Sequence, residues 1–266
     1  MQIWQAIVLG TVQGLTEFLP VSSSGHLVFL QQIMGVDFGG NQLFFDIMLH
    51  FGTLIAVFFV FWRDILELFK KPFKTLLYLI VATVPAGLVG LFLNDYIETR
   101  FYGGAYLSIG FALTALILLL CEFVAKRRKN PARPLGWRTT VPMGLMQAVA
   151  VIPGISRSGS TIAAGVFAGG KTEEIAKFSF LMSIPVILGS VVVSLKDVIT
   201  EREALASLGG TGVACILLGM LFAAVSGLFA IKVMLKVIGK ANYKWFSLYL
   251  VLLSLTCFAL NVKGIF

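Results

Sequence analysis

Charged residues are scarce in this sequence. Only 13% of its 266 residues are Asp, Glu, Lys or Arg, about half of the usual share of about 25% in soluble domains. In contrast, 58% are hydrophobic and the mean hydropathy is +0.93. This composition excludes an ordinary water-soluble domain. The formal net charge is +8, but the basic residues lie between long apolar runs, so we expect no nucleic-acid partner.

Cysteine is also scarce, and it occurs only inside apolar sequence. Cys121, Cys215 and Cys257 are odd in number, which predicts buried free thiols and argues against a disulfide framework or a cysteine metal site. The first 20 residues lack the basic segment that opens a secretory signal peptide, so we do not expect one there.

The sequence has several apolar runs that are long enough to cross a bilayer, which takes roughly 20 residues. It therefore predicts an all-α integral membrane protein, organised as one polytopic domain over residues 1–266. The six predicted spans are 43–62, 76–93, 105–124, 176–195, 210–231 and 245–262.

Two shorter stretches, 10–35 and 144–169, resemble each other at a constant offset of 134 residues. Both are hydroxyl-rich clusters inside apolar sequence, and the offset is about half of the chain, which favours an internal duplication. We expect repeats at about 1–124 and 139–262, joined by a basic loop at 125–138. The identical pairs are Gly10/Gly144, Gln13/Gln147, Ser22/Ser156, Ser24/Ser158, Gly25/Gly159 and Gly35/Gly169.

Proline, glycine and serine interrupt each stretch in its middle, at 20–25 and at 153–159. Each half then has some ten residues, which reach roughly to the bilayer midplane. We interpret both stretches as re-entrant helical hairpins, because irregular backbone at that depth needs protein or a water-filled cavity around it. A single kinked span through each stretch is the alternative.

The distribution of basic residues supports the hairpins. If the first hairpin returns to its own side, 16 of the 21 basic residues share one face, which is then cytoplasmic, and both termini lie outside. Each repeat has one hairpin and three spans, an odd number of crossings, so the second repeat is inserted upside down. The two hairpin tips can then meet near the middle of the membrane.

Two charged residues lie in these hairpins, Glu17 in the first and Arg157 in the second. A charge at the centre of a bilayer costs roughly 2.5–3.5 kcal/mol by insertion scales, so each needs compensation. The two residues could pair simply to stabilise the fold. That interpretation leaves the hydroxyl clusters unexplained, so we favour a phosphate site in which Arg157 binds the anion bidentately.

The residues around Arg157 fit such a site. Serine hydroxyls cap helices well, and a helix N-terminus binds phosphate readily. Because Glu17 and a phosphate would repel each other, we expect a divalent cation between them, Mg²⁺ or another such as Ca²⁺, with Gln13 one turn earlier as a neutral ligand. The candidate phosphate-binding residues are Ser22, Ser24, Gly25, Ser156, Ser158, Gly159 and Thr161.

Histidines add two further candidates. His26 follows the Ser-Gly turn and could serve as a nucleophile or a general acid, although a lone membrane histidine is often only a hydrogen-bonded core residue. Asp46 and His50 lie one turn apart on the first span and either support the site or form a local structural pair.

The motifs Q-G-L-T-E-F-L-P-V-S-S-S-G-H (Gln13 to His26) and P-G-I-S-R-S-G-S-T (Pro153 to Thr161) resemble the two signatures of the bacterial undecaprenyl-diphosphate phosphatases, also called bacitracin-resistance proteins. Span number, motif order and length agree over the whole chain. The resemblance assigns Gln13 and Glu17 to the acidic motif, Ser23 and His26 to the serine-histidine motif, and Arg157 to phosphate binding. The family allows Glu or Gln at the first acidic position, so Gln13 argues against a strictly two-carboxylate metal site.

The resemblance implies hydrolysis of the C55 lipid diphosphate to the monophosphate, which recycles the carrier for peptidoglycan synthesis and gives bacitracin resistance. It also implies a divalent cation and a multi-pass position in the bacterial inner (plasma) membrane, surrounded by lipid, with a site that opens to the outer face. Ser23 or His26 attacks the phosphorus or activates a water; we lean towards Ser23 with His26 as its base.

The rival interpretation is a transporter that flips polyprenyl phosphate lipids, since many carriers are built from inverted repeats with broken helices. A carrier needs the anion site but neither a metal-bound acid nor a nucleophile, so we favour the enzyme. A purely structural membrane protein would leave Glu17, His26 and Arg157 uncompensated. The oligomeric state stays open, with a homodimer as one option, as does the preferred prenyl chain length.

Overall fold

The computed structural model describes residues 1–39, 41–128, 132–200, 209–237 and 242–266, and its regular elements in these ranges are all helices. In chain order they are α1 (Ile3–Phe18), α2 (Ser23–Ile33), α3 (Gln42–Leu68), α4 (Lys74–Phe92), α5 (Asn94–Phe101), α6 (Leu107–Arg127), α7 (Trp137–Val149), α8 (Arg157–Phe167), α9 (Thr172–Thr200), α11 (Gly209–Val237) and α12 (Lys244–Val262).

Six of these helices are long and apolar enough to cross a membrane: α3, α4, α6, α9 over Thr172–Val193, α11 and α12. The six predicted spans are thus confirmed as apolar helices of sufficient length. Two helices end well beyond the predicted bounds: α11 continues to Val237 instead of ending near residue 231. The other is α3, which continues to Leu68 instead of ending near residue 62, with non-helical dihedral angles at Phe61. Its last residues are amphipathic, so hydropathy alone ended the predicted span too early.

The remaining long stretches form two pairs of short helices. We call α1 and α2 the first helix pair, and α7 and α8 the second helix pair. Their helices have 16 and 11 residues in the first pair, and 13 and 11 in the second. At 1.5 Å per residue, each is shorter than the roughly 30 Å of a bilayer core.

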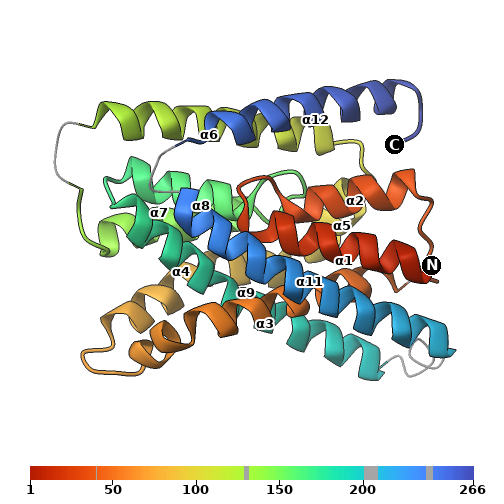
Figure 1. Cartoon of the computed structure of the whole chain (residues 1–266), viewed down its shortest axis with the longest axis horizontal. Helices are drawn as coiled ribbons and strands as arrows, with labels where there is room; N and C mark the ends of the chain where they lie inside the picture. Colours follow the sequence, from red (N-terminus) through yellow and green to blue (C-terminus); the bar gives the residue numbers. More distant parts are fainter. Residues whose placement is uncertain (40, 129–131, 201–208, 238–241) are drawn as a thin grey trace.

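The two helix pairs approach each other from opposite ends of the molecule (Figure 1). Both chain termini and the outer end of the first pair lie at the right end of the view. The outer end of the second pair lies at the left end, together with the connection from α3 to α4 and with the end of α6 and the residues just before α7. Lys70 and Lys71 lie between α3 and α4, Arg128 follows α6 and Arg133 precedes α7; we call this end of the molecule the basic end.

Each helix pair packs closely against a long helix of the other half of the chain. Gly10 of α1 lies so near α11 that an added Cβ would be 2.2 Å from the Gly219 carbonyl oxygen. Gly144 of α7 lies against α4 in the same way, with the added Cβ 2.7 Å from the Ala82 carbonyl oxygen. Small residues allow such close approach between apolar helices, where van der Waals contact is a main source of stability.

The outer surfaces of the long helices are apolar. Large hydrophobic side chains such as Phe59, Leu91 and Phe258 are more than half exposed, as expected for side chains that face lipid rather than water. Cys121, Cys215 and Cys257 are buried and carry free thiols, which confirms the prediction made for them.

Candidate active site

Each helix pair turns through a short non-helical segment and begins its second helix with a serine cap. The Ser22 hydroxyl accepts from the Gly25 N–H at 3.4 Å, and the Ser156 hydroxyl accepts from the Gly159 N–H at 3.1 Å. These caps satisfy donors that a helix start leaves free. The two caps differ in backbone conformation. Ser22 has a φ of 67°, in the left-handed region that is strained for a residue with a side chain, whereas Ser156 has an ordinary φ of −68°.

The turns of the two pairs contact each other directly. The Ser158 hydroxyl donates to the Leu19 carbonyl at 3.0 Å. A Cβ on Gly159 would lie 3.2 Å from Pro20 Cβ, and one on Gly25 would lie 2.9 Å from Gly154 Cα. Gly25 and Gly159, which we predicted as phosphate-binding residues, are therefore positions of close packing between the two turns.

Glu17 lies at the centre of this contact, with its side chain only 4% exposed. Its Oε2 accepts a hydrogen bond from the Ser23 hydroxyl at 2.6 Å and from Gln13 Nε2 at 3.0 Å. The same oxygen is 3.1 Å from His50 Nδ1 of α3. One carboxylate thus joins a hydroxyl of α2 to polar groups of α1 and α3.

Arg157 reaches the same carboxylate from the second pair. One of its terminal nitrogens pairs with Glu17 Oε1, and the other donates to the Ser179 carbonyl of α9 at 3.0 Å. Its side chain is 16% exposed, so a buried carboxylate and a half-buried guanidinium of opposite charge meet across the two pairs. A guanidinium has five N–H donors, so these two contacts leave donors for a phosphate.

His26 does not lie beside Ser23 in the way that our preferred nucleophile and base require. Its Nδ1 is 2.7 Å from the Ser22 carbonyl oxygen, and its Nε2 is 2.7 Å from the Tyr249 hydroxyl of α12. The imidazole also stacks on the Tyr249 ring. Because both ring nitrogens have other partners, the group placed to accept the Ser23 proton is Glu17.

The other candidate phosphate-binding hydroxyls differ in their surroundings. Thr161 bonds to the carbonyls of Arg157 and Ser158 and to the Ser179 hydroxyl at 2.7 Å, so it braces the start of α8. Ser24 is half-buried, and its hydroxyl has no hydrogen bond to any described residue.

Gln13 is the remaining predicted metal ligand. Its Oε1 is buried and has no hydrogen-bond partner among the described residues, although a buried amide oxygen normally has one. No group of three His, Cys, Asp or Glu side chains in the described ranges could hold a metal ion. Mg²⁺ commonly takes one or two protein oxygens and completes its shell with water and substrate phosphates. The Glu17 carboxylate and the Gln13 amide oxygen fit that kind of site.

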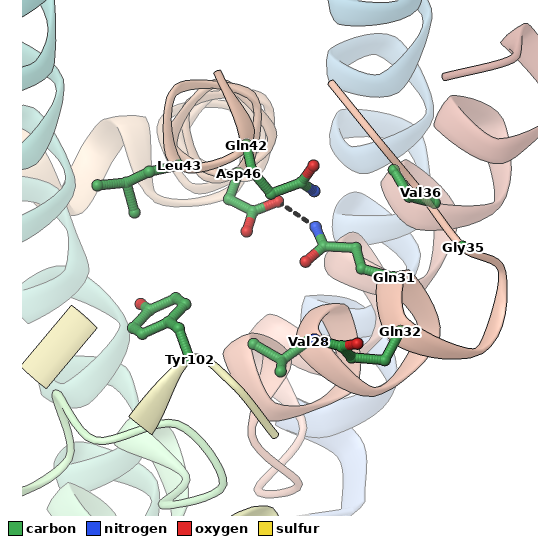
Figure 2. A pocket seen from close by; sticks show the side chains of 9 residues that line it. All are labelled: Val28, Gln31, Gln32, Gly35, Val36, Gln42, Leu43, Asp46 and Tyr102. Atoms are coloured by element: carbon green, nitrogen blue, oxygen red, sulfur yellow. Dashed lines mark hydrogen bonds between the residues drawn. The ribbon is translucent and has the colours of Figure 1, made fainter. Parts of the chain in front are cut away.

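Asp46 has a different environment from His50. It points across a cavity of about 230 Å³ between α2 and α3, where its Oδ1 accepts from Gln31 Nε2 at 2.6 Å (Figure 2). Both side chains are buried. Asp46 therefore links α3 to α2, whereas His50, one turn further along α3, touches Gln13 and Glu17.

Two residues that contact His26 and Arg157 were not predicted from the sequence. Tyr249 lies in an apolar run, and nothing in the local pattern connects it to His26. Ser179 contributes its backbone carbonyl to Arg157, and a backbone group carries no sequence signal. In the second pair, Gln147 donates to the Ala82 carbonyl at 3.4 Å instead of to a carboxylate.

A comparison with protein families decides where the chain belongs. The model of the family described as bacitracin resistance protein BacA matches residues 6–256. This chain belongs to the BacA family. The protein is accordingly a multi-pass membrane protein, as its six apolar helices indicate.

Several curated proteins are similar to this chain over most or all of their length. One is named undecaprenyl-diphosphatase, from Carboxydothermus hydrogenoformans, and is 43% identical, with all of both chains covered. Others with the same name come from Methanobrevibacter smithii, 40% identical over all of both chains, and Halothermothrix orenii, 40% identical over 94% of each.

Proposed function

We propose that this protein hydrolyses undecaprenyl diphosphate to undecaprenyl phosphate and inorganic phosphate. The observation that carries the proposal is the Glu17 carboxylate, which holds the Ser23 hydroxyl on one side and the Arg157 guanidinium on the other. A nucleophile, a proton acceptor and an anion-binding cation are thereby collected in one place. The relatives named undecaprenyl-diphosphatase support the same substrate.

The architecture we propose for this site is a pair of re-entrant hairpins in an inverted repeat. The short helices of both pairs, their approach from opposite ends (Figure 1) and their matching serine caps support this arrangement. Further support comes from the close approaches of Gly10 and Gly144, each against a long helix of the opposite half. The repeats are then about 1–124 and 139–262, joined by the basic loop.

The orientation we propose follows from charge. The basic end faces the cytoplasm, because positively charged loops are retained there, so both termini lie outside in a bacterial inner membrane. The lipid diphosphate enters with its C55 prenyl chain between apolar helices and its head group at the contact of the two turns. The active site opens to the outer face.

In the reaction we propose, Ser23 Oγ attacks the terminal phosphorus and its proton passes to Glu17. The new bond joins Oγ to phosphorus, and the bond between phosphorus and the bridging oxygen breaks, which releases undecaprenyl phosphate. Glu17 passes the Ser23 proton to the leaving phosphate oxygen. It then takes a proton from the water that attacks the phosphoserine and returns it to Ser23 Oγ as the bond between phosphorus and Oγ breaks, which frees inorganic phosphate and restores the hydroxyl. Arg157 stabilises the charge on the transferred group, which is the main requirement of phosphoryl transfer.

We also propose a divalent cation, held by Glu17 and Gln13 and completed by the substrate. When bound, it would neutralise charge on the phosphate oxygens. The buried, unpaired Gln13 Oε1 supports this assignment. His26 we place in a supporting role, fixing the start of α2 against α12 through Tyr249.

A flippase for polyprenyl phosphates would need the anion site but not the short contact between Ser23 and Glu17, so we favour the enzyme. The test is release of inorganic phosphate from undecaprenyl diphosphate by purified protein, with and without a chelator. The proposal expects metal-dependent release that requires Ser23, Glu17 and Arg157. Absence of release, together with lipid transport in proteoliposomes, would support the flippase instead.

A further inference from the structure

The cavity between α2 and α3 lies at the end of the molecule that holds both chain termini, and it has a volume of about 230 Å³. Its polar lining residues are Gln31, Gln32, Gln42, Asp46 and Tyr102. Figure 2 shows Gln31, Gln42 and Asp46 on one side of the cavity and Tyr102 on another. The reaction proposed above uses none of these residues, so the cavity needs an explanation of its own.

Asp46 is the acidic residue of this cavity. Its side chain is buried and forms no ion pair with a basic residue of the described ranges. Its Oδ1 accepts from Gln31 Nε2 at 2.6 Å, whereas its Oδ2 points toward the cavity (Figure 2) and has no hydrogen bond to another described residue. Aspartate is almost never fully buried without a partner, because an unpaired buried charge is costly. The cavity is therefore the place where a compensating cation would bind.

Two glutamines can add oxygen ligands to this carboxylate. Because Gln31 uses its Nε2 for Asp46, its Oε1 is left as an acceptor, and this oxygen has no hydrogen bond to another described residue. Gln42 Nε2 is buried and lacks a hydrogen-bond partner within the described part of the chain. A half-turn of that amide would place Oε1 in the same position, since the two ends of an amide group have nearly the same shape. Both glutamines can thus present oxygen to the cavity.

One carboxylate and neutral amide oxygens are typical ligands of a hard cation. Ca²⁺ takes roughly six to eight oxygens from carboxylates, side-chain amides and waters in a flexible arrangement, so it does not require three acidic side chains. Mg²⁺ demands a near-ideal octahedron and is usually bound through carboxylates and substrate phosphates. A cavity of about 230 Å³ has room for an ion with several waters. This ligand set and this volume therefore fit Ca²⁺ better than Mg²⁺.

We propose that this cavity is a calcium site, in which the Asp46 carboxylate binds Ca²⁺ together with side-chain oxygens of Gln31 and Gln42 and with water. The site is separate from the cation proposed at the active site, and it does not depend on the proposed reaction. Gln31 belongs to α2, whereas Gln42 and Asp46 belong to α3, so the bound ion links the second helix of the first helix pair to α3. With one charged ligand, the dissociation constant should be on the order of 10⁻⁴ to 10⁻³ M, as in extracellular calcium modules.

The direct test is thermal unfolding of the purified protein in detergent, without substrate, as Ca²⁺ is added. We expect about 10 mM Ca²⁺ to raise the unfolding temperature of the wild type, because an ion that binds only the folded state stabilises it. Asp46→Asn keeps an oxygen that accepts from Gln31 but loses the charge, so most of this rise should disappear. An equal rise in both proteins, or no rise in the wild type, would overturn the proposal.

A second variant should strengthen the site. Gln31→Glu places another carboxylate beside Asp46, so the two charges repel each other without an ion and bind Ca²⁺ together. We expect the metal-free variant to unfold at a lower temperature than the wild type, and its dissociation constant for Ca²⁺ to fall by at least about 10-fold. A merely structural hydrogen bond between Gln31 and Asp46 predicts the loss of stability alone. Destabilisation without tighter Ca²⁺ binding would therefore contradict the assignment.

The matched control is Asp37→Asn. Asp37 lies in the connection between α2 and α3, is exposed, and accepts from the Gly39 N–H at 2.8 Å. This change removes the same charge at the same end of the molecule without altering a lining residue of the cavity. The response to Ca²⁺ should therefore match that of the wild type. A loss as large as in Asp46→Asn would mean that Ca²⁺ responds to the general charge of this end and not to the cavity.

Glu17→Gln separates this site from the cation proposed at the active site. The part of the Ca²⁺ effect that depends on Asp46 should persist in Glu17→Gln, and the same concentration of Mg²⁺ should reproduce little of it. If the whole effect is lost in Glu17→Gln and kept in Asp46→Asn, the ion binds only at the active site and the cavity is not a calcium site. Because unfolding is measured without substrate, a protein that releases no phosphate would leave this assignment standing.

Discussion

The first and second helix pairs share their framework and differ in their chemistry. Both begin the second helix with a serine cap, and both place a glycine against a long helix of the other half. Only the first pair has a carboxylate and a histidine at its turn, and only the second has an arginine there. The positions that match therefore build the structure, and those that differ carry charge.

This division explains why one pair alone could not form the site. Glu17 without Arg157, or Arg157 without Glu17, would be an isolated buried charge, whose effective penalty is several kcal/mol. When the two pairs meet, each charge supplies the partner of the other. In the reaction we propose, a phosphate entering this contact would meet a guanidinium already oriented by Glu17 and by the Ser179 carbonyl.

The largest expected effect comes from giving the second pair the residue of the first. Arg157→Ser should lower phosphate release by about 10³- to 10⁵-fold, the range for an arginine that stabilises phosphoryl transfer. Release from undecaprenyl diphosphate in detergent is the measurement, with circular dichroism to verify folding. Retained turnover in a folded variant would remove Arg157 from the reaction.

A smaller but still severe effect should follow from removal of the proposed nucleophile. Ser23→Ala should reduce turnover on the order of 10³-fold and abolish any phosphoenzyme trapped from labelled substrate. Thr11→Val serves as the control, because among the described residues its hydroxyl bonds only to the Ile7 carbonyl of its own helix. A labelled enzyme that survives in Ser23→Ala would move the nucleophile elsewhere.

Exchange of the packing glycines tests the part that the two pairs share. Gly10→Ala and Gly144→Ala should each lower the free energy of unfolding by about 1–3 kcal/mol, because the new methyl group overlaps backbone atoms. Gly87→Ala on α4 meets no atom within 4 Å and should be neutral or stabilising. Chemical unfolding in detergent measures the free energy of unfolding of the three variants. A loss of stability in only one of Gly10→Ala and Gly144→Ala would contradict the proposal that the two helix pairs pack in equivalent ways.

The smallest effect should be at His26. If it only supports α2, His26→Gln and Tyr249→Phe should each reduce turnover by no more than about 10-fold, the loss of one hydrogen bond. Were His26 the base for Ser23, its substitution would be as damaging as that of Ser23. The ratio of the two losses, measured under identical conditions, separates these roles.

Hydropathy was sufficient to predict the long helices, because a bilayer span needs an unbroken apolar run. The need to compensate buried charges predicted that Glu17 and Arg157 lie at one site, with direct pairing as the alternative to phosphate binding, and the two side chains are in contact. The sequence could not predict which side chains of the candidate site form hydrogen bonds with one another. Ser23 and His26 are close in the sequence, but the helical turn directs the imidazole to Tyr249, 223 residues away, and the hydroxyl to Glu17.

A double-mutant cycle between Glu17→Gln and Arg157→Gln, followed by chemical unfolding without substrate, tests the central contact most directly. Each single change leaves one buried charge unpaired, so the account predicts that each destabilises the protein strongly and that the double variant recovers part of the loss. The coupling free energy should be about 1–3 kcal/mol. Additive effects, within about 0.5 kcal/mol, would mean that the two pairs do not bring these side chains together.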